Sequence, residues 1–166
     1  MLDIKNLTIK YGDKKPVENF SLTLNKGEII TIVGESGSGK STVISSILGL
    51  LPNNGKIVKG DILYNEKSLL KYDINKWREL RGTKITMISQ DFCGTLNPIK
   101  KIGKQFVEYI RTHSKLSKKE AEIKAKEMLG KVNLTDLEII MKSYPQQLSG
   151  GMKQRVGIAM ALTFNT

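Results

Sequence analysis

The chain has 166 residues, of which 39% are hydrophobic and 26% charged, so it can bury one hydrophobic core of ordinary domain size. No stretch approaches the about 20 apolar residues that a membrane-spanning helix needs, and Met1–Lys10 alternates in polarity, so we expect no signal peptide there. Its single cysteine and single histidine exclude an internal disulfide and a His/Cys metal cluster, while the formal net charge of +11 raises the question of an anionic partner.

Antiparallel strands are predicted at the start of the chain. Leu2–Ile9 alternates apolar and polar residues, a turn follows at Tyr11–Asp13, and Val17–Leu24 is the second strand. A turn at Asn25–Gly27 leads into Ile29–Val33, whose apolar residues predict a buried strand. Tyr11 has two interpretations of about equal weight: a ring that stacks on adenine, or a half-buried strand tyrosine.

A phosphate-binding loop follows the third predicted strand. The pattern G-x-x-x-x-G-K-[ST] is met by Gly34, Gly39, Lys40 and Ser41. Glycines at 34, 37 and 39 let the backbone turn several N–H groups toward phosphate oxygens, and the next helix adds its positive end. Lys40 is then a charge for the β- and γ-phosphates of ATP, and Ser41 a hydroxyl ligand for Mg²⁺. The predicted nucleotide-binding residues here are Gly34, Ser36, Gly37, Ser38, Gly39, Lys40, Ser41 and Thr42.

Four further elements are predicted before residue 92. They are a helix over Thr42–Leu51, a strand over Ile57–Tyr64, a short helix over Asp73–Arg81 capped by Asp73, and a buried strand over Lys84–Ser89. Gln90 directly follows the last strand. Because strand ends face the ligand crevice in open α/β sheets, Gln90 is a candidate to contact a metal or an attacking water, with a surface-loop glutamine as the alternative.

A helical insert of about 50 residues is predicted next. Pro98–Arg111 has an apolar face with Pro98 in the first turn, and Ser117 and Glu120 form a capping box that opens a second helix. Ten Lys or Arg and four Glu lie between Lys100 and Lys131, which contribute +6 of the net charge. Aromatic and basic residues do not interleave in this segment as they do where bases stack, so we interpret it as a solvated face and expect no specific nucleic-acid binding.

A second glycine-rich turn lies near the end of the chain, where Leu148-Ser149-Gly150-Gly151-Met152-Lys153-Gln154 precedes a predicted helix. Ser149, Gly150 and Gly151 can present N–H groups and a hydroxyl to another phosphate. Together with the phosphate loop, this stretch resembles the signature of ATP-binding-cassette (ABC) ATPases, and the resemblance covers residues 1–162.

Several stretches narrow the resemblance to the oligopeptide, dipeptide and nickel importer ATPases. They are Val-Gly-Glu-Ser-Gly-Ser-Gly-Lys-Ser at 33–41, Leu-Gly-Leu-Leu-Pro at 48–52, Gln90-Asp91 followed by Thr95-Leu96-Asn97-Pro98, and Tyr144-Pro145. Ser89 departs from the pattern, since an aromatic often stands there, and Phe92-Cys93-Gly94 is unusual after the glutamine.

The resemblance implies an α/β fold, that of a P-loop NTPase of the ABC type, with an antiparallel β subdomain and an inserted helical subdomain. The implied divisions are 1–91 (β subdomain and P-loop core), 92–148 (helical subdomain) and 149–166 (signature and following helix). The resemblance also implies that Tyr11 stacks on adenine and that Ser41 and Gln90 are ligands of Mg²⁺. Gln90 would in addition be the catalytic coupling glutamine. Ser149, Gly150, Gly151 and Gln154 would bind the ATP of a second ABC ATPase subunit, while the insert faces transmembrane permease subunits at the cytoplasmic face of the membrane.

The family pattern continues with four apolar residues and Asp-Glu (Walker B), and later with a switch histidine, none of which follows in this sequence. We therefore expect an N-terminal, C-terminally truncated portion of a longer ATPase that does not hydrolyse ATP by itself. Two alternatives stay open: a soluble ABC ATPase that acts on ribosomes or DNA, and a nucleotide-binding module without turnover.

Overall fold

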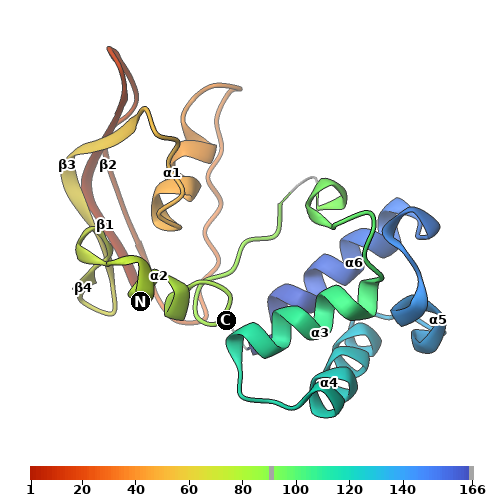
Figure 1. Cartoon of the computed structure of the whole chain (residues 1–166). Coiled ribbons are helices and arrows are strands. Elements are labelled where there is room, and N and C mark those ends of the chain that lie inside the picture. Colours follow the sequence, from red (N-terminus) through yellow and green to blue (C-terminus); the bar gives the residue numbers. More distant parts are fainter. Residues whose placement is uncertain (90–91, 165–166) are drawn as a thin grey trace. The chain divides into compact units, whose positions relative to one another are not determined.

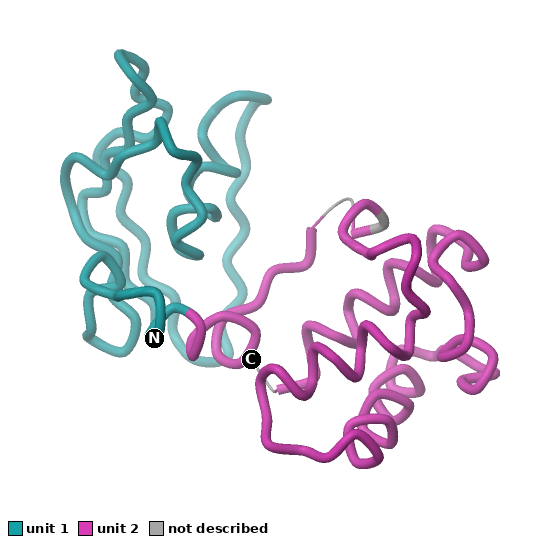
Figure 2. The backbone as a smooth tube through the Cα atoms, viewed as in Figure 1, with its two compact units in different colours: residues 1–77 teal, residues 78–166 magenta. Residues whose placement is uncertain are grey.

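The computed structural model describes residues 1–89 and 92–164. These residues form two compact units, Met1–Trp77 and Arg78–Thr166 (Figure 2), each with its own packing. The predicted divisions after residues 91 and 148 stay predictions.

A four-stranded antiparallel sheet forms the first unit, in the order β2-β1-β3-β4 (Figure 1). Its strands are β1 (Leu2–Tyr11), β2 (Lys14–Leu24), β3 (Gly55–Tyr64) and β4 (Lys67–Ser68). The two predicted strands at the start of the chain and the strand over 57–64 are therefore confirmed. Their alternating pattern places Ile4, Leu7, Ile9 and Ile62 in the core, each at most 1% exposed.

The register of β1 against β2 shifts near Asn6 and Asn19, both of which have a left-handed backbone. Side chains hold these irregularities in place: the Asn6 N–H donates to Ser21 Oγ at 2.8 Å, and the Asn19 N–H donates to Thr8 Oγ1 at 3.2 Å. Asparagine tolerates this backbone region better than other side chains do, which explains why the strands bulge here.

One helix packs beside the sheet within the first unit. Helix α1 (Lys40–Ile47) buries Val43 and Ser46, and Leu48 follows at 6% exposure. Ile44 is 40% exposed, because the buried face of this helix is narrow and holds only Val43 and Ser46. The chain then passes Gly49, whose Cα lies so close to the Trp77 ring that an added Cβ would stand 2.5 Å from Trp77 Cζ2.

Short elements link the sheet to the second unit. A 3₁₀ turn, η1 (Leu69–Lys71), precedes α2 (Ile74–Leu80). Asp73 caps α2 as predicted, since its Oδ1 accepts from the Lys76 N–H at 2.9 Å.

Two predicted strands are wrong. Residues 29–33 form an extended segment outside any sheet, with Ile29 94% and Val33 87% exposed. Residues 84–89 are likewise not a strand, and only an isolated bridge joins Arg81 to Ile85. The physical reason is the same for both: in the described part of the chain, the sheet holds only β1–β4, so neither apolar run has a strand to pair with.

Helices build the second unit around one core. They are α3 (Ile102–His113), α4 (Lys118–Lys131), α5 (Leu137–Lys142) and α6 (Gly150–Ala161), with 3₁₀ turns η2 (Cys93–Thr95), η3 (Pro145–Gln147) and η4 (Leu162–Phe164). Phe106, Ile110, Leu129 and Val156 are fully buried between them. The capping box of α4 is confirmed by reciprocal bonds between Ser117 and Glu120.

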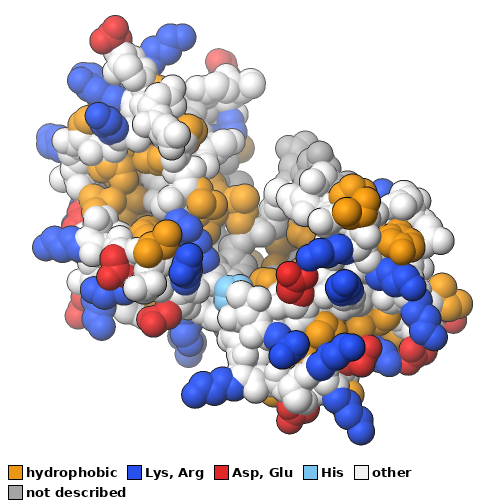
Figure 3. Space-filling model, viewed as in Figure 1, with side chains coloured by type: hydrophobic (Ala, Val, Ile, Leu, Met, Phe, Trp, Pro, Cys, Tyr) orange, Lys and Arg blue, Asp and Glu red, His pale blue; other side chains and the backbone are white. Residues whose placement is uncertain are grey.

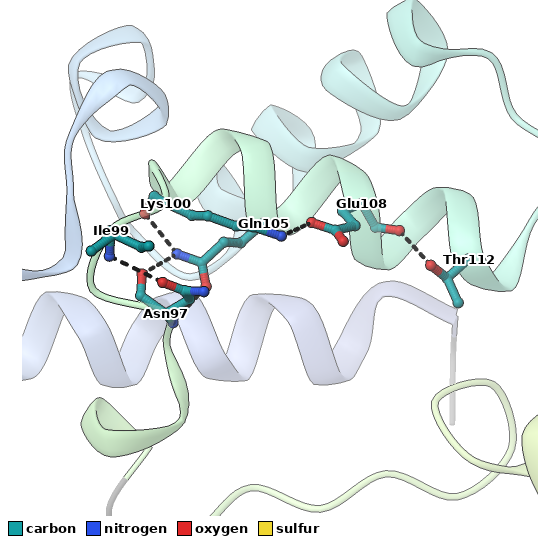
Figure 4. A network of polar contacts seen from close by, with 6 residues as sticks. All are labelled: Asn97, Ile99, Lys100, Gln105, Glu108 and Thr112. Carbon is teal, nitrogen blue, oxygen red and sulfur yellow. Dashed lines mark hydrogen bonds and ion pairs between the residues drawn. The ribbon is translucent and has the colours of Figure 1, made fainter.

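Helix α3 begins at Ile102, four residues later than predicted. The preceding segment is held in a non-helical path by the Gln105 side chain, which accepts from the Asn97 N–H at 2.9 Å and donates to the Lys100 carbonyl at 2.8 Å (Figure 4). Ile99 therefore lies outside the helix at 83% exposure instead of on its buried face. None of the helices in the described residues combines the length and the apolar composition needed to cross a membrane.

Candidate functional site

The phosphate loop of the first unit connects the extended segment 29–33 to helix α1. The Lys40 side chain folds back over this loop, where its ammonium donates to the Gly34 carbonyl at 2.7 Å, to the Glu35 carbonyl at 2.5 Å and to Ser38 Oγ at 3.3 Å. Lys40 is thus placed at the centre of the loop, and its partners are neutral oxygens. An incoming phosphate offers a charged acceptor in their place.

Two glycines give the loop its turn. Gly37 and Gly39 have φ values of +84° and +90°, a region that other residues rarely adopt. Gly39 also lies against β2, since an added Cβ would stand 2.3 Å from the Pro16 carbonyl oxygen. Gly34 differs from the prediction because its φ is not left-handed; its lack of a side chain leaves room for Ser38 Oγ, 2.8 Å from where a Cβ would be.

The loop ends in the first turn of α1, where the backbone supplies further donors. The N–H groups of Lys40, Ser41 and Thr42 precede the first bond of the helix, from the Val43 N–H to the Gly39 carbonyl at 2.9 Å. This helix start carries no acidic residue in its first turn. A positive helix end with three N–H donors thus adjoins the loop that the Lys40 ammonium covers, and this combination of groups binds phosphate.

A pocket of about 350 Å³ adjoins the loop within the same unit. The loop contributes Gly34, Ser38 and Lys40 to its lining, and β2 contributes the apolar Pro16, Val17 and Phe20 together with the acidic Glu18. The sequence prediction missed these β2 residues. No local pattern indicates them, because their place beside the loop results from the packing of Gly39 on Pro16.

Tyr11 lies at the end of β1, opposite Lys14 of β2 and Gly55 of β3. Its ring packs against Gly55, where an added Cβ would stand 2.6 Å from Tyr11 Cε1. The ring is half-buried and does not line the pocket beside the phosphate loop. Its stacking on adenine stays a prediction.

The second glycine turn begins α6 in the other unit. Ser149 is the N-cap, with its Oγ accepting from the Met152 N–H at 3.3 Å. Gly150 and Gly151 are exposed, and a Cβ on either would meet nothing within 4 Å, so the helix start is open to a ligand from outside. The phosphate loop belongs to the first unit and this turn to the second, so they are two separate candidate sites.

Gln154 contacts the segment that leads to Gln90. Its Nε2 donates to the Ser89 carbonyl at 3.4 Å, an approach across 65 residues that the sequence did not indicate. Ser89 Oγ is buried without a hydrogen-bond partner among the described residues. Gln90 itself, predicted as catalytic and as a metal ligand, lies outside the described residues. Within residues 1–89 and 92–164, His, Cys, Asp and Glu side chains do not gather into a metal-binding group of three.

Comparison with known proteins gives consistent matches over nearly the whole chain. Residues 17–166 match the model of the family described as ABC transporter. The dipeptide transport ATP-binding protein DppD of Lactococcus lactis subsp. cremoris is 41% identical over 98% of this chain and 48% of its own length. The oligopeptide transport ATP-binding protein AppD of Bacillus subtilis is 42% identical over 99% of this chain and 52% of its own. The chain therefore spans about half the length of these curated relatives.

Among solved structures, ABC transporter cassettes also match the chain. The dimeric structure of MJ0796, a bacterial ABC transporter cassette, matches with a TM-score of 0.84 and 29% identity, covering 99% of this chain and 70% of that one. The post-hydrolysis state of the same cassette, bound to ADP and Pi, matches with a TM-score of 0.83 and 30% identity over 99% of this chain and 70% of that one.

Proposed function

The chain belongs to the ABC transporter family, and from this membership we propose that it is the ATP-binding part of an importer of dipeptides or oligopeptides. The relatives named above supply the substrate class, since their names refer to dipeptide and oligopeptide transport. Nickel, the third substrate that the sequence resemblance implied, has no support among them. Because the chain spans about half of each relative, activity, substrate and partners are proposals for the whole protein.

The phosphate loop is the observation that carries the nucleotide-binding part of the proposal. It combines left-handed glycines, the N–H groups of a helix start and the Lys40 ammonium, which now lies on the Gly34 carbonyl. When ATP binds, Lys40 exchanges the Gly34 and Glu35 carbonyls for the β- and γ-phosphates, and the N–H groups of residues 40–42 hold the remaining oxygens.

The other site residues are assigned by their chemistry. Ser41 offers its hydroxyl to Mg²⁺, which would supply charge neutralisation between the phosphates when bound. Tyr11 provides a ring for adenine, and the exposed turn at Ser149–Gly151, with Gln154, serves the ATP held by a second ABC ATPase subunit. Gln90 would link the nucleotide to transmembrane permease subunits, which place the protein at the cytoplasmic face of the membrane.

Titration with a fluorescent ATP analogue in the presence of Mg²⁺ tests this proposal. Lys40→Ala should abolish saturable binding, because the ammonium and the loop N–H groups act on the same phosphates. Lys26→Ala is a matched control, since Lys26 is exposed in a turn of the same unit and does not line the pocket. Equal affinity in the unchanged chain and in Lys40→Ala would show that the phosphate-loop assignment is wrong.

A further inference from the structure

A basic groove lies between α3, α4 and α5, and residues of neither glycine turn line it. Its volume is about 810 Å³, and seven Lys or Arg and three Glu line it, giving a net charge of +4. Figure 3 shows how the blue side chains gather over the helices of this unit, with hydrophobic surface between them. The sequence had suggested only a solvated basic face here, whereas the structure concentrates that charge in a concave site.

The net charge of +4 remains outside the two internal ion pairs, where five cations and Glu122 line the groove. Lys100 pairs with Glu108 at 2.9 Å, and Lys126 pairs with Glu138. Hydrogen bonds from these lysines hold the pKa of each glutamate below its ordinary value, so both pairs stay ionised and each cancels one lysine. The remaining lining cations, which make no ion pair within the described residues, are Lys101, Lys104, Arg111, Lys118 and Lys142.

The cations follow the long axis of α3. Lys101, Lys104 and Arg111 recur at helical spacing on one face, over ten residues or about 15 Å. An extended peptide advances about 3.3 Å per residue, so a segment of about five residues matches that length. A compact anion such as a single phosphate would meet only one or two of these side chains.

Close packing and hydrogen bonds shape the floor and rim of the groove. Gly103 permits the close approach of α3 and α5, since a Cβ there would stand 2.6 Å from the Met141 carbonyl oxygen. Val107 and Met141 form an apolar floor. At the rim, the Gln105 amide fixes the segment that carries Lys100, and Lys100 itself reaches along α3 to Glu108 (Figure 4).

From this charge, length and concavity we propose that the groove between α3, α4 and α5 binds a short acidic segment of a partner protein in extended form. A flat anionic membrane does not enter a concave site, and the lining holds no aromatic ring on which nucleic-acid bases would stack. Acidic side chains pair with the cations of the rim, while intervening apolar residues rest on the floor. The inference goes beyond nucleotide binding and does not depend on it.

The test uses a fluorescein-labelled peptide of about ten residues in which glutamate alternates with leucine, titrated with the full chain by fluorescence anisotropy. Saturable binding that persists at an ionic strength of about 0.15 M is expected, and a peptide with glutamine in place of glutamate should not bind. Absence of saturable binding, or equal binding of the glutamine peptide, would overturn the proposal.

Charge-reversal variants distinguish the groove from the overall charge of the chain. The double variant Lys104→Glu/Arg111→Glu should weaken peptide binding at least about tenfold, because both side chains line the groove. Lys115→Glu/Lys119→Glu makes the same change in net charge at exposed positions outside the groove and should change affinity less than about twofold. Equal weakening by both variants would mean nonspecific attraction and would refute the site. Stronger groove-dependent binding of single-stranded nucleic acid or of phosphatidylserine vesicles than of the peptide would also refute it.

Discussion

Alanine at Gly39 tests whether the contact of the phosphate loop with β2 holds the loop in place. Gly39 has φ +90°, and an added Cβ would stand 2.3 Å from the Pro16 carbonyl oxygen. Gly37 is a matched control, because its φ of +84° is almost the same while nothing lies within 4 Å of its Cβ position. Both substitutions therefore place an L side chain in the left-handed region, but only Gly39→Ala adds a clash with backbone.

The two effects differ in size. A left-handed backbone costs a residue with a Cβ about 1–2 kcal/mol, so Gly37→Ala should lower the free energy of unfolding of the first unit by about that amount. At Gly39 the β2 backbone must also move, and overpacking of this kind adds about 1–3 kcal/mol. We therefore expect Gly39→Ala to lower the free energy of unfolding by about 2–5 kcal/mol.

The fluorescence of Trp77 reports this transition in urea. It is the single tryptophan of the chain, and its ring lies against Gly49 at the end of α1, the helix that Gly39 begins. Gly39→Ala should unfold at a clearly lower urea concentration than Gly37→Ala, and it should bind the ATP analogue more weakly. Equal midpoints for the two variants would show that the Pro16 contact does not stabilise the loop.

Two further predictions concern the helical unit. Ser117→Ala removes the N-cap of α4 and should lower the free energy of unfolding by about 1 kcal/mol in urea, and an unchanged midpoint would contradict this role of the cap. Burial lowers the pKa of His113 below its ordinary 6.5, so the unfolded chain binds this proton more readily and stability should fall as the pH drops below 6.5. His113→Phe, which can keep the edge contact with Tyr109, should reduce that loss, as measured by urea unfolding at several pH values.

Patterns among residues that are close together in the sequence predicted much of the fold. The fold class, an ABC ATPase fold with an antiparallel sheet and helices, is confirmed by the family match and the solved structures. The Ser117–Glu120 capping box and the Asp73 cap were predictable because each satisfies backbone N–H groups within a few residues along the chain. Alternation of apolar residues in β1 likewise depends only on the period of a strand.

Features that depend on distant partners were not predictable. Ile29–Val33 has the composition of a buried strand, but composition does not say whether a neighbouring strand is present to pair with it. The approach of Gly39 to Pro16 and of Gln154 to Ser89 arises from packing between segments far apart in sequence. The late start of α3 has a similar cause, because the Gln105 side chain captures the turn before the helix.

The exposed segment Ile29–Val33 also affects how the chain behaves in concentrated solution. All five of its residues are β-branched, and none is charged or proline, which is the composition of segments that stack into intermolecular β structure. The net charge of +11 opposes such association by repulsion between copies, and salt weakens that repulsion. Solubility of the chain is therefore expected to decrease as ionic strength rises, with this segment as the nucleus of the aggregates.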